Sequence, residues 1–374
     1  MQDELEGFLK DFLDPWYRSL ANPKETQEST LSSLLQTYAR TDYGARFVSE
    51  KSSMEDFRKS FPVATYDDLM PYIRKVEGGD FRALFAEPVV GWVMTRGTTG
   101  SPKLIPVTET HLSQVFSNGA RALTNFALKK DSQILASKVL NLNFPSEVGM
   151  KNTSVGNKSY GYSSGTYAKM FPSFGETGLV PVQEDIDAIG SGITKEDWER
   201  RFDLVYEKAK TQNVGSVMGV TPVILAFAYY VKKKHKVFPK DVWNLKALFC
   251  TSVAKIHSKY SPMLRYVYGD APIVEMYSAT EGVFGQQFDE LPYLCMNNDT
   301  YFFEARTSGG MKLLCEMKPR EWGSIVISSS LLPRYEIGDL VEALGKGYFR
   351  IFGRANTRAA LEHRMYNLFT GRWF

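Results

Sequence analysis

The stretch TRGTTGSPK, residues 95–103, has the composition of a phosphate-binding loop. Its glycines allow main-chain amides to approach a phosphate without a Cβ in the way, and Lys103 adds positive charge. Hydroxyl donors stand at Thr98, Thr99 and Ser101. The order is not that of a GxxxxGK[ST] P-loop, because Pro102 directly precedes the lysine. The stretch follows a predicted strand and precedes a helix expected to begin near Thr108; a surface hairpin rich in glycine and threonine is the alternative.

Outward from this loop, short apolar runs alternate with segments of helical period, which is typical of an α/β domain. The expected strands are PVVGWVMT, SQILASKVLNL, VGSVMGV, LKALFCTSV and PIVEMYSA. Between them, Thr194 is expected to cap a helix with an apolar stripe at Trp198, Phe202, Val205 and Ala209. The cluster VKKKHK, residues 231–236, indicates the solvated carboxyl end of a helix that begins near Pro222.

Beyond about residue 290 the pattern changes to short alternating strands broken by Gly, Asn and Pro, which indicates a small β-rich, barrel-like subdomain. These strands are YFFEAR, MKLLCEM, GSIVISS, DLVEAL and YFRIFGR. The expected organisation is an α/β region over residues 1–290, the β-rich subdomain over 291–352 and a terminal segment over 353–374. Within that last segment AALEH, residues 359–363, is either vector-derived or part of a native helix.

Composition excludes several classes of function. The 45 basic and 42 acidic residues nearly balance at a net charge of +3, so nucleic acid is not an expected partner. Three cysteines without CxxC spacing and four scattered histidines support neither a disulfide framework nor a zinc site. The amino-terminal MQDELEGFLKDFL is acidic and amphipathic, and no apolar run approaches 18 residues. We therefore expect a cytoplasmic protein without a signal peptide or membrane span.

Three downstream motifs suggest a nucleotide. In EMYSATEG, residues 275–282, Tyr277 can stack on a purine and Glu281 can hold Mg²⁺ between phosphate oxygens, although a tyrosine and a glutamate near a strand end are often structural. In YEIGDLVE, Asp339 can bind both hydroxyls of a ribose. In FRIFGR, Arg354 can contact ribose or phosphate.

Together TRGTTGSPK, YSATEG, YEIGD and FGR resemble the core motifs of the adenylate-forming superfamily of acyl-CoA synthetases, adenylation domains and luciferase-like enzymes. Within it the chain is most similar to the GH3 acyl acid amido synthetases, through LLQTYARTDYGARF, FPVATYDDLMPYIRKVEGGD and GYSSGTYA. The similarity covers about residues 30–355. It implies the large amino-terminal domain of the superfamily, with helices packed on β-sheets and a small β-rich subdomain.

The resemblance also implies roles for matching positions. Lys103, Thr280 and Glu281 would be catalytic, with Thr280 near the α-phosphate and Glu281 on Mg²⁺. The nucleotide would contact Thr95, Gly97, Thr98, Thr99, Gly100, Ser101, Ser252, Val253, Tyr277, Ser278, Ala279, Asp339 and Arg354. Of these, Ser252 and Val253 belong to CTSVA, the segment whose backbone would border the adenine.

The sequence departs from the family pattern in places. Arg96 stands where a small hydroxyl residue is usual, Ser278 where glycine is usual, and Glu336 where arginine is common before the Gly-Asp pair. The family's mobile carboxyl-terminal domain, which carries a lysine used in adenylation, would begin near Ala355 and Asn356. Since the sequence ends at Phe374, we expect this chain to be impaired in turnover.

The resemblance implies an ATP- and Mg²⁺-dependent ligase that activates a small carboxylic acid as an acyl-adenylate and transfers the acyl group to an amine. The acyl pocket is expected along residues 160–167 and 217–230. One alternative is an acid–CoA ligase resembling phenylacetate-CoA ligases, in which the thiol of CoA is the acceptor. Another is a nucleotide-binding protein without turnover. The sequence names neither the acid, the acceptor nor the oligomeric state.

Overall fold

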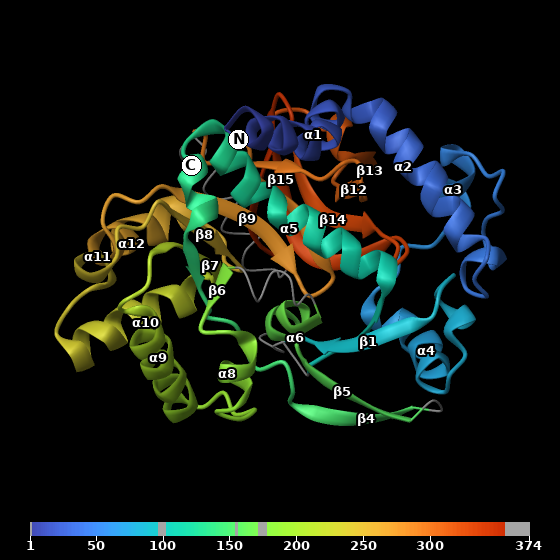
Figure 1. The fold of residues 1–374 in the computed structure, drawn as a ribbon. Coiled ribbons are helices and arrows are strands. Elements are labelled where there is room, and N and C mark those ends of the chain that lie inside the picture. The colour runs from blue at the N-terminus through green and yellow to red at the C-terminus, as the bar shows by residue number, and fades with distance from the viewer. Residues whose placement is uncertain (1, 96–101, 154–155, 171–177, 356–374) are drawn as a thin grey trace.

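A computed structural model describes residues 2–95, 102–153, 156–170 and 178–355. Within these residues two β-sheets form the frame, and helices cover them (Figure 1). The larger sheet has twelve strands in the order β13-β12-β14-β15-β16-β11-β10-β9-β8-β7-β3-β6. A four-stranded sheet has the order β2-β1-β5-β4. The predicted mixed α/β fold class is confirmed.

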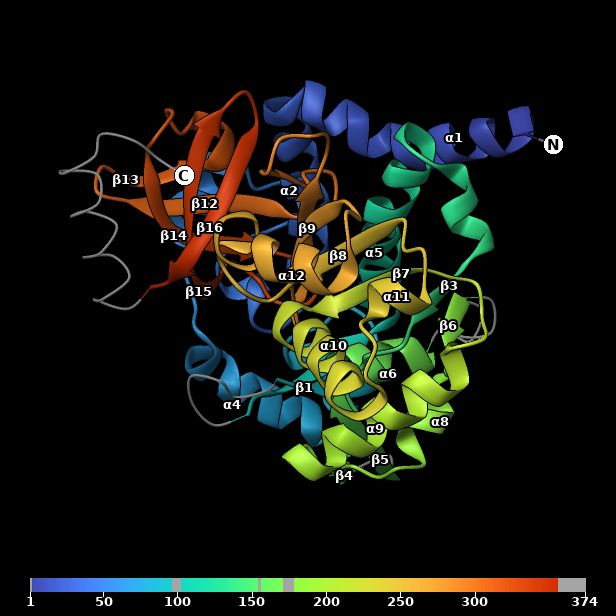
Figure 2. The ribbon, with the colours of Figure 1, turned by 90° about the vertical axis from the view of Figure 1, so that its left-hand side faces the viewer.

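The larger sheet has a parallel part and an antiparallel part, which meet at β9. The parallel strands are β3 (Lys138–Leu140), β6 (Leu179–Val180), β7 (Val214–Val220), β8 (Ala247–Thr251) and β9 (Ile273–Ala279). The antiparallel strands are β10 (Gly282–Gln287), β11 (Leu294–Met296), β12 (Phe302–Thr307), β13 (Gly310–Leu313), β14 (Trp322–Ser328), β15 (Tyr335–Gly345) and β16 (Tyr348–Arg354). Figure 2 shows β12–β16 gathered on one side of the molecule. Hydrogen bonding continues from β10 to β11, across the predicted boundary at residue 290, which stays a prediction.

The smaller sheet holds the loop with which the sequence analysis began. Its strands are β1 (Val89–Met94), β2 (Leu104–Thr108), β4 (Gly149–Thr153) and β5 (Gly156–Tyr162). Antiparallel pairing of β1 with β2 makes residues 95–103 the connection of a hairpin. β5 runs parallel to β1 and ends beside it, with Tyr162 opposite Met94. The loop therefore starts where β5 ends.

Helices fill the connections and protect the sheets. They are α1 (Gln2–Ala21), α2 (Pro23–Tyr38), α3 (Met54–Ser60), α4 (Tyr66–Glu77), α5 (Glu109–Lys129), α6 (Ser163–Met170), α8 (Gln183–Asp187), α9 (Lys195–Ala209), α10 (Thr221–His235), α11 (Pro239–Val242) and α12 (Ser261–Tyr268). Short turns are η1 (Gly44–Arg46), η2 (Phe81–Ala83), η3 (Ser132–Ala136), η4 (Ile256–Tyr260) and η5 (Leu314–Glu316). None of the helices in the described part of the chain combines the length and hydropathy needed to cross a bilayer.

The strand β8 shows why the parallel strands read as continuous apolar runs. All five of its residues are buried, because helices cover both of its faces. Phe249 packs toward α5, where its ring lies 6.1 Å from that of Phe126. Leu248 and Cys250 belong to the second core, which α9, α10 and α12 complete. Because successive side chains of β8 point to opposite faces of the sheet, this strand contributes to both cores.

Most expected elements are present. Thr194 caps α9 with a reciprocal hydrogen-bond pair to Asp197, and Thr108 caps α5, as predicted. Two expected strands are shorter than their apolar runs. SQILASKVLNL begins with the 3-10 turn η3, because the side chain of Asp131 accepts from the amide of Gln133. MKLLCEM leaves its strand at Leu313 and continues as the turn η5.

The helices α1 and α2 fasten the antiparallel strands from outside. The indole of Trp16 donates to the carbonyl of Met296 over 3.2 Å. The Gln27 amide donates to the carbonyls of Asn298 and Tyr301 over 2.9 and 2.7 Å. At the end of α2, the Tyr38 hydroxyl donates to the carbonyl of Ser329 over 2.8 Å. The first helices of the chain therefore hold strands formed near its other end.

Candidate active site

The candidate site lies at the edge of the large sheet where the parallel strands end. β8 ends at Thr251 and β9 at Ala279, and β9 then reverses into β10. Thr280 and Glu281 are the two residues of this turn. The next residue, Gly282, has a positive φ of 155°, and a Cβ there would lie 2.7 Å from the Tyr301 hydroxyl. Glycine is therefore required for the turn to sit this close to Tyr301.

Lys103 and Glu281, which were predicted from separate motifs, both contact the hydroxyl of Tyr335. The Lys103 ammonium donates to the Tyr335 hydroxyl over 3.1 Å. The Tyr335 hydroxyl donates to Glu281 Oε1 over 3.5 Å, a long contact. Lys103 also lies over the ring of Tyr66, 5.2 Å from its centroid. The end of the hairpin loop and the β9–β10 turn therefore share one polar cluster.

Glu281 is a carboxylate held in an environment that disfavours its charge. It is 8% exposed, and burial raises its pKa above the usual value. The positive charges of Lys103 and Arg354 oppose this shift, and the charge of Asp339 adds to it. A buried carboxylate that two cations only partly compensate is suited to bind a further cation.

Tyr277, Asp339 and Arg354 form a second cluster across three strands. The Tyr277 hydroxyl donates to Asp339 Oδ2 over 2.9 Å, and Arg354 Nε lies 3.1 Å from Asp339 Oδ1. Asp339 and Arg354 are direct partners in the pairing of β15 with β16. Burial raises the pKa of Asp339, and Arg354 and Tyr277 oppose the shift. Tyr277 is 7% exposed, and its ring lies 5.2 Å from Phe284.

The segment after β8 reaches the same edge through a hydroxyl pair. Thr251 Oγ1 and Ser278 Oγ lie 2.8 Å apart. The segment CTSVA, residues 250–254, therefore leaves β8 beside β9. Ser252 is exposed with a positive φ of 75°, and Val253 is half-buried. Ala279 is also half-buried at the end of β9. The predicted positions after β8 and β9 therefore lie side by side.

The hairpin loop itself is described only at its two ends. Arg96, Gly97, Thr98, Thr99, Gly100 and Ser101 lie outside the described residues. The amide of Thr95 donates to the Lys103 carbonyl over 2.9 Å, and the Lys103 amide donates to Thr95 Oγ1 over 2.9 Å. The stretch is thus a hairpin connection, and its closing lysine points to Tyr335 and Glu281. A hairpin and a ligand loop are compatible descriptions of this segment.

Glu336, one departure from the family pattern, is engaged elsewhere. Its carboxylate pairs with Arg306 at 3.2 Å on the neighbouring surface. Its amide donates to the carbonyl of Ala64, and the Ala64 amide donates to the carbonyl of Arg334. The carboxylate therefore contributes no charge to the cluster around Glu281.

Sequence reasoning missed the tyrosines that join the predicted residues. Tyr335 is the first residue of the quoted stretch YEIGDLVE, and Tyr66 lies in FPVATYDDLMPYIRKVEGGD, but both are buried and have the pattern of core residues. The Tyr66 hydroxyl donates to the carbonyl of Leu104 over 2.8 Å, next to Lys103. The predicted strand DLVEAL begins at Asp339, whereas β15 begins at Tyr335, so the sequence carried no signal that Tyr335 shares a strand with Asp339.

The described residues hold no cluster of three or more His, Cys, Asp or Glu side chains that could enclose a metal ion. This does not argue against Mg²⁺, which is commonly bound by one or two carboxylates together with substrate phosphates and water. Glu281 fits that role, being a buried carboxylate at the edge where the loop of residues 95–103 ends.

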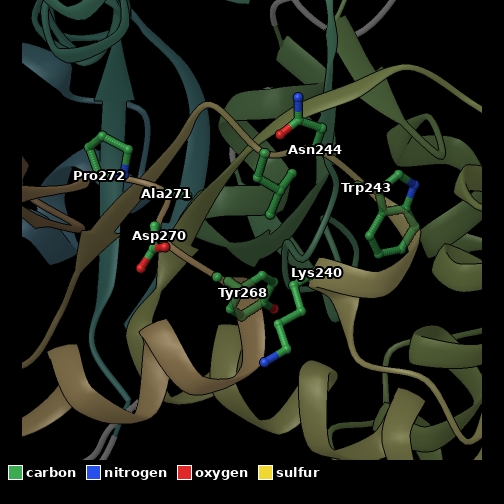
Figure 3. Close-up of a pocket in the computed structure, with 9 residues that line it drawn as sticks. Lys240, Trp243, Asn244, Tyr268, Asp270, Ala271 and Pro272 are labelled. Atoms are coloured by element: carbon green, nitrogen blue, oxygen red, sulfur yellow. The ribbon is translucent and has the colours of Figure 1, made fainter.

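A cavity of about 400 Å³ lies at the opposite end of the same strands (Figure 3). Its lining residues precede β8 and β9 in the chain, whereas the turn that carries Glu281 follows the other end of β9. Its lining residues are Lys240, Trp243, Asn244, Leu245, Tyr268, Gly269, Asp270, Ala271 and Pro272. None of these was predicted to contact nucleotide, and the cavity is not part of the candidate site.

Comparison with known proteins agrees with the motifs. Residues 14–183 match the GH3 family N-terminal domain. The 4-substituted benzoates-glutamate ligase GH3.12 of Arabidopsis thaliana is 23% identical in an alignment 392 residues long, gaps included. The alignment covers 87% of this chain and 67% of the relative. The indole-3-acetic acid-amido synthetase GH3.15 of the same plant is 35% identical over 98 residues, 26% of this chain and 16% of the relative. The predicted resemblance is confirmed.

Two solved structures share the fold. The GH3.15 acyl acid amido synthetase in complex with 2,4-DB has a TM-score of 0.75 at 17% identity, over 95% of this chain and 70% of its own. An open conformation of 2-hydroxyisobutyryl-CoA ligase has a TM-score of 0.61 at 16% identity, over 88% and 74%. At these identities the likeness shows the fold of the adenylate-forming enzymes and no more.

Proposed function

We propose that this chain, a homologue of the GH3 acyl acid amido synthetases, is an ATP-dependent ligase that joins a small carboxylic acid to an amine. One observation carries the proposal. Lys103, at the end of the glycine- and threonine-rich loop, and Glu281, in the β9–β10 turn, contact the same hydroxyl of Tyr335. A cation and a buried carboxylate from two nucleotide-type motifs thus converge at one sheet edge.

The reaction has two steps. A carboxylate oxygen of the acid attacks the α-phosphorus of ATP, the bond to the bridging oxygen breaks, and pyrophosphate leaves. The amine nitrogen then attacks the acyl carbon of the adenylate, AMP leaves with the former carboxylate oxygen, and the nitrogen loses a proton. No side chain acts as a nucleophile in either step. Catalysis comes from positioning and from stabilisation of charge.

The phosphate end is assigned to Lys103, Glu281 and Thr280. Lys103 would donate to phosphate oxygens in place of its bond to Tyr335, and Thr280 would lie near the α-phosphate. Glu281 would hold Mg²⁺, which when bound neutralises charge on the phosphate oxygens. The hydroxyls and amides of Thr95, Gly97, Thr98, Thr99, Gly100 and Ser101 complete the proposed cradle.

The nucleoside end is assigned to the cluster around Asp339. Each carboxylate oxygen has two lone pairs, so Asp339 can accept from ribose hydroxyls while Tyr277 and Arg354 hold it in place. Ser252, Val253, Ser278 and Ala279 would line the base. An acyl pocket is proposed along residues 160–167 and 217–230, which include α6 and the start of α10.

Nucleotide binding is the first test. Calorimetry should show binding of ATP with Mg²⁺, and of AMP, to the folded chain. Exchange of labelled pyrophosphate into ATP, measured over a panel of aryl and medium-chain acids, then reports the first step. Acid-dependent exchange supports the proposal. Nucleotide binding without exchange for any acid favours a nucleotide-binding protein without turnover.

The acceptor is tested by mass. With a productive acid, amino acids and CoA are supplied in parallel and the products are weighed. An acyl–amino acid product supports the amido synthetase. An acyl-CoA product with no amide would replace it with the acid–CoA ligase, whose fold is also represented among the structural neighbours.

A further inference from the structure

A buried histidine and a buried tyrosine, neither assigned to the nucleotide above, meet behind the turn that carries Glu281. His111 is fully buried in the first turn of α5, and Tyr167, in α6, is 7% exposed. His111 Nε2 and the Tyr167 hydroxyl lie 2.9 Å apart. The same hydroxyl donates to the main-chain carbonyl of Thr280 over 2.9 Å. The three groups form a continuous line of hydrogen bonds.

The direction of these bonds follows from chemistry. A carbonyl oxygen can only accept, so Tyr167 gives its single proton to Thr280. The hydroxyl must then accept from His111, which places a hydrogen on Nε2 and leaves Nδ1 without one. Nδ1 is buried and has no partner among the described residues. Burial lowers the pKa of His111 to about 3, so the ring is neutral under ordinary conditions.

The line of hydrogen bonds joins the two halves of the candidate site. His111 follows directly on β2, where its amide donates to the capping hydroxyl of Thr108 over 3.3 Å. Tyr167 belongs to α6, which begins immediately after β5, the parallel neighbour of β1. Both side chains are thus anchored to the sheet that carries the loop of residues 95–103, and both hold the turn that carries Glu281.

The turn has a second support from the same helix. Ser163 Oγ lies 3.3 Å from Thr280 Oγ1. Ser163 and Tyr167 are four residues apart, so they share one face of α6. One therefore meets the side chain of Thr280 and the other its carbonyl, which fixes the orientation of the peptide before Glu281.

We propose that His111 and Tyr167 are positioning residues, a neutral histidine–tyrosine relay that sets the Thr280–Glu281 turn in register with the loop of residues 95–103. This inference rests on the proposed function, because the register matters only if loop and turn hold one nucleotide. Neither residue is assigned a contact with the nucleotide. Their effect is to place Glu281 and Thr280 where Mg²⁺ and phosphates are to be bound.

The test uses amide substitutions that mimic one ring nitrogen at a time. In His111→Gln the amide nitrogen stands near the position of Nε2 and can donate to Tyr167. In His111→Asn it stands near Nδ1 and cannot reach. Tyr167→Phe removes the relay hydroxyl and keeps the ring. The matched control is Tyr268→Phe, which removes another buried tyrosine hydroxyl, one that donates to the Ile224 carbonyl over 2.7 Å in the second core rather than to the Thr280–Glu281 turn.

The dissociation constants of ATP with Mg²⁺ and of AMP are measured by calorimetry, together with thermal stability. We expect Tyr167→Phe and His111→Asn to weaken Mg²⁺-dependent ATP binding about five- to tenfold, as for loss of one buried hydrogen bond. AMP binding should weaken by a smaller factor, because AMP has the α-phosphate near Thr280 but lacks the β- and γ-phosphates. His111→Gln should stay within about twofold of the parent. The double variant with Tyr167→Phe and His111→Asn should be no weaker than Tyr167→Phe alone.

The relay is overturned if Tyr167→Phe binds like the parent, if glutamine and asparagine at position 111 behave alike, or if Tyr268→Phe weakens ATP equally. If the parent chain binds ATP and Tyr167→Phe binds it with the same affinity, the relay is refuted and the proposed function is not. A folded parent chain that binds no adenine nucleotide refutes the proposed function, and the relay's role falls with it.

Discussion

The Lys103 ammonium lies 3.1 Å from the Tyr335 hydroxyl, although 232 positions separate the two residues in the chain. The lysine ends the hairpin loop of the small sheet, and the tyrosine opens β15 of the large one. Their hydrogen bond therefore ties the two sheets together at the point where a phosphate would bind. A ligand that takes this lysine must compete with the tyrosine.

Replacement of Glu281 by glutamine tests the proposed Mg²⁺ site. The change keeps the shape of the side chain and removes its charge, so ATP affinity in the presence of Mg²⁺ should fall about tenfold or more, equivalent to about 1.4 kcal/mol or more. Binding of AMP without metal should be nearly unchanged. Calorimetry at a series of Mg²⁺ concentrations makes the measurement. Glu336→Gln, which removes a carboxylate paired with Arg306 outside the cluster, is the control. If both variants keep the parent's Mg²⁺ dependence, Glu281 is not a metal ligand.

Replacement of Tyr335 by phenylalanine tests the bridge. Without the hydroxyl, Lys103 and Glu281 each lose one buried partner, and we expect ATP binding to weaken about three- to tenfold through less ordered phosphate contacts. The nucleoside contacts are assigned to other side chains, so AMP should bind as before. Tyr38→Phe, which removes a buried hydroxyl that donates to Ser329, is a matched control for stability. Equal losses for AMP and ATP would place Tyr335 at the nucleoside end instead.

The Asp339 cluster predicts a different selectivity. Asp339→Ala should weaken AMP and ATP alike, about tenfold, because a charged acceptor for ribose hydroxyls is lost. Tyr277→Phe keeps the ring and loses only the bond to Asp339, so about threefold is expected for both nucleotides. Equilibrium titration with each nucleotide distinguishes this pattern from that of Glu281→Gln. Unchanged AMP affinity in both variants would show that the nucleoside lies elsewhere.

Glu275 predicts a pH dependence of stability. Burial raises the pKa of this carboxyl on β9 from an ordinary 4.5 to about 8. Between those values the folded chain holds a proton that the unfolded chain lacks, so the free energy of unfolding falls as pH rises. Glu275→Gln carries no such proton. Relative to the parent it should gain roughly 2–4 kcal/mol from about pH 5 to about pH 9, since each pKa unit corresponds to about 1.4 kcal/mol.

Urea unfolding at several pH values measures that gain. Two neighbours face Glu275: His257 Nε2, 3.7 Å from Oε2, and Cys250 on β8, whose pKa burial raises to about 12. Burial lowers the pKa of His257 below its ordinary value, so the change in its charge falls on the acid side of that of Glu275. Parallel pH profiles for parent and variant would mean that Glu275 titrates normally in the folded state.

The sequence was most informative where local rules decide structure. Buried parallel strands such as β7, β8 and β9 are continuous apolar runs, and Thr194 signals its helix through a capping box. The run beginning SQILA was read as strand because it is apolar, whereas the turn that Asp131 caps depends on a side-chain contact. Apolar composition alone does not separate a buried strand from a buried turn.

For the site, motifs predicted Lys103, Glu281, Asp339 and Arg354, and the fold brings these side chains to one edge. Their roles stay predictions. Tyr335, Tyr66 and His111 were not predicted as site residues, and Tyr167 was expected only in the acyl pocket, because a buried aromatic or histidine has the pattern of a core residue. What distinguishes them is one polar atom aimed at a residue far along the chain, as between Tyr167 and Thr280, 113 positions apart. Such pairing is not encoded in local spacing.

The fastening of the antiparallel strands by α1 and α2 has a consequence for synthesis. These helices are translated well before their hydrogen-bond partners, which lie 268 to 291 positions later, at residues 296–329. Until the ribosome has passed those partners, the apolar stripe with Leu13 and Trp16, fully buried in the finished fold, lacks part of its core, including Tyr348. The docking of α1 and α2 is therefore completed late, and until then their apolar side chains stay exposed to aggregation and to chaperone binding.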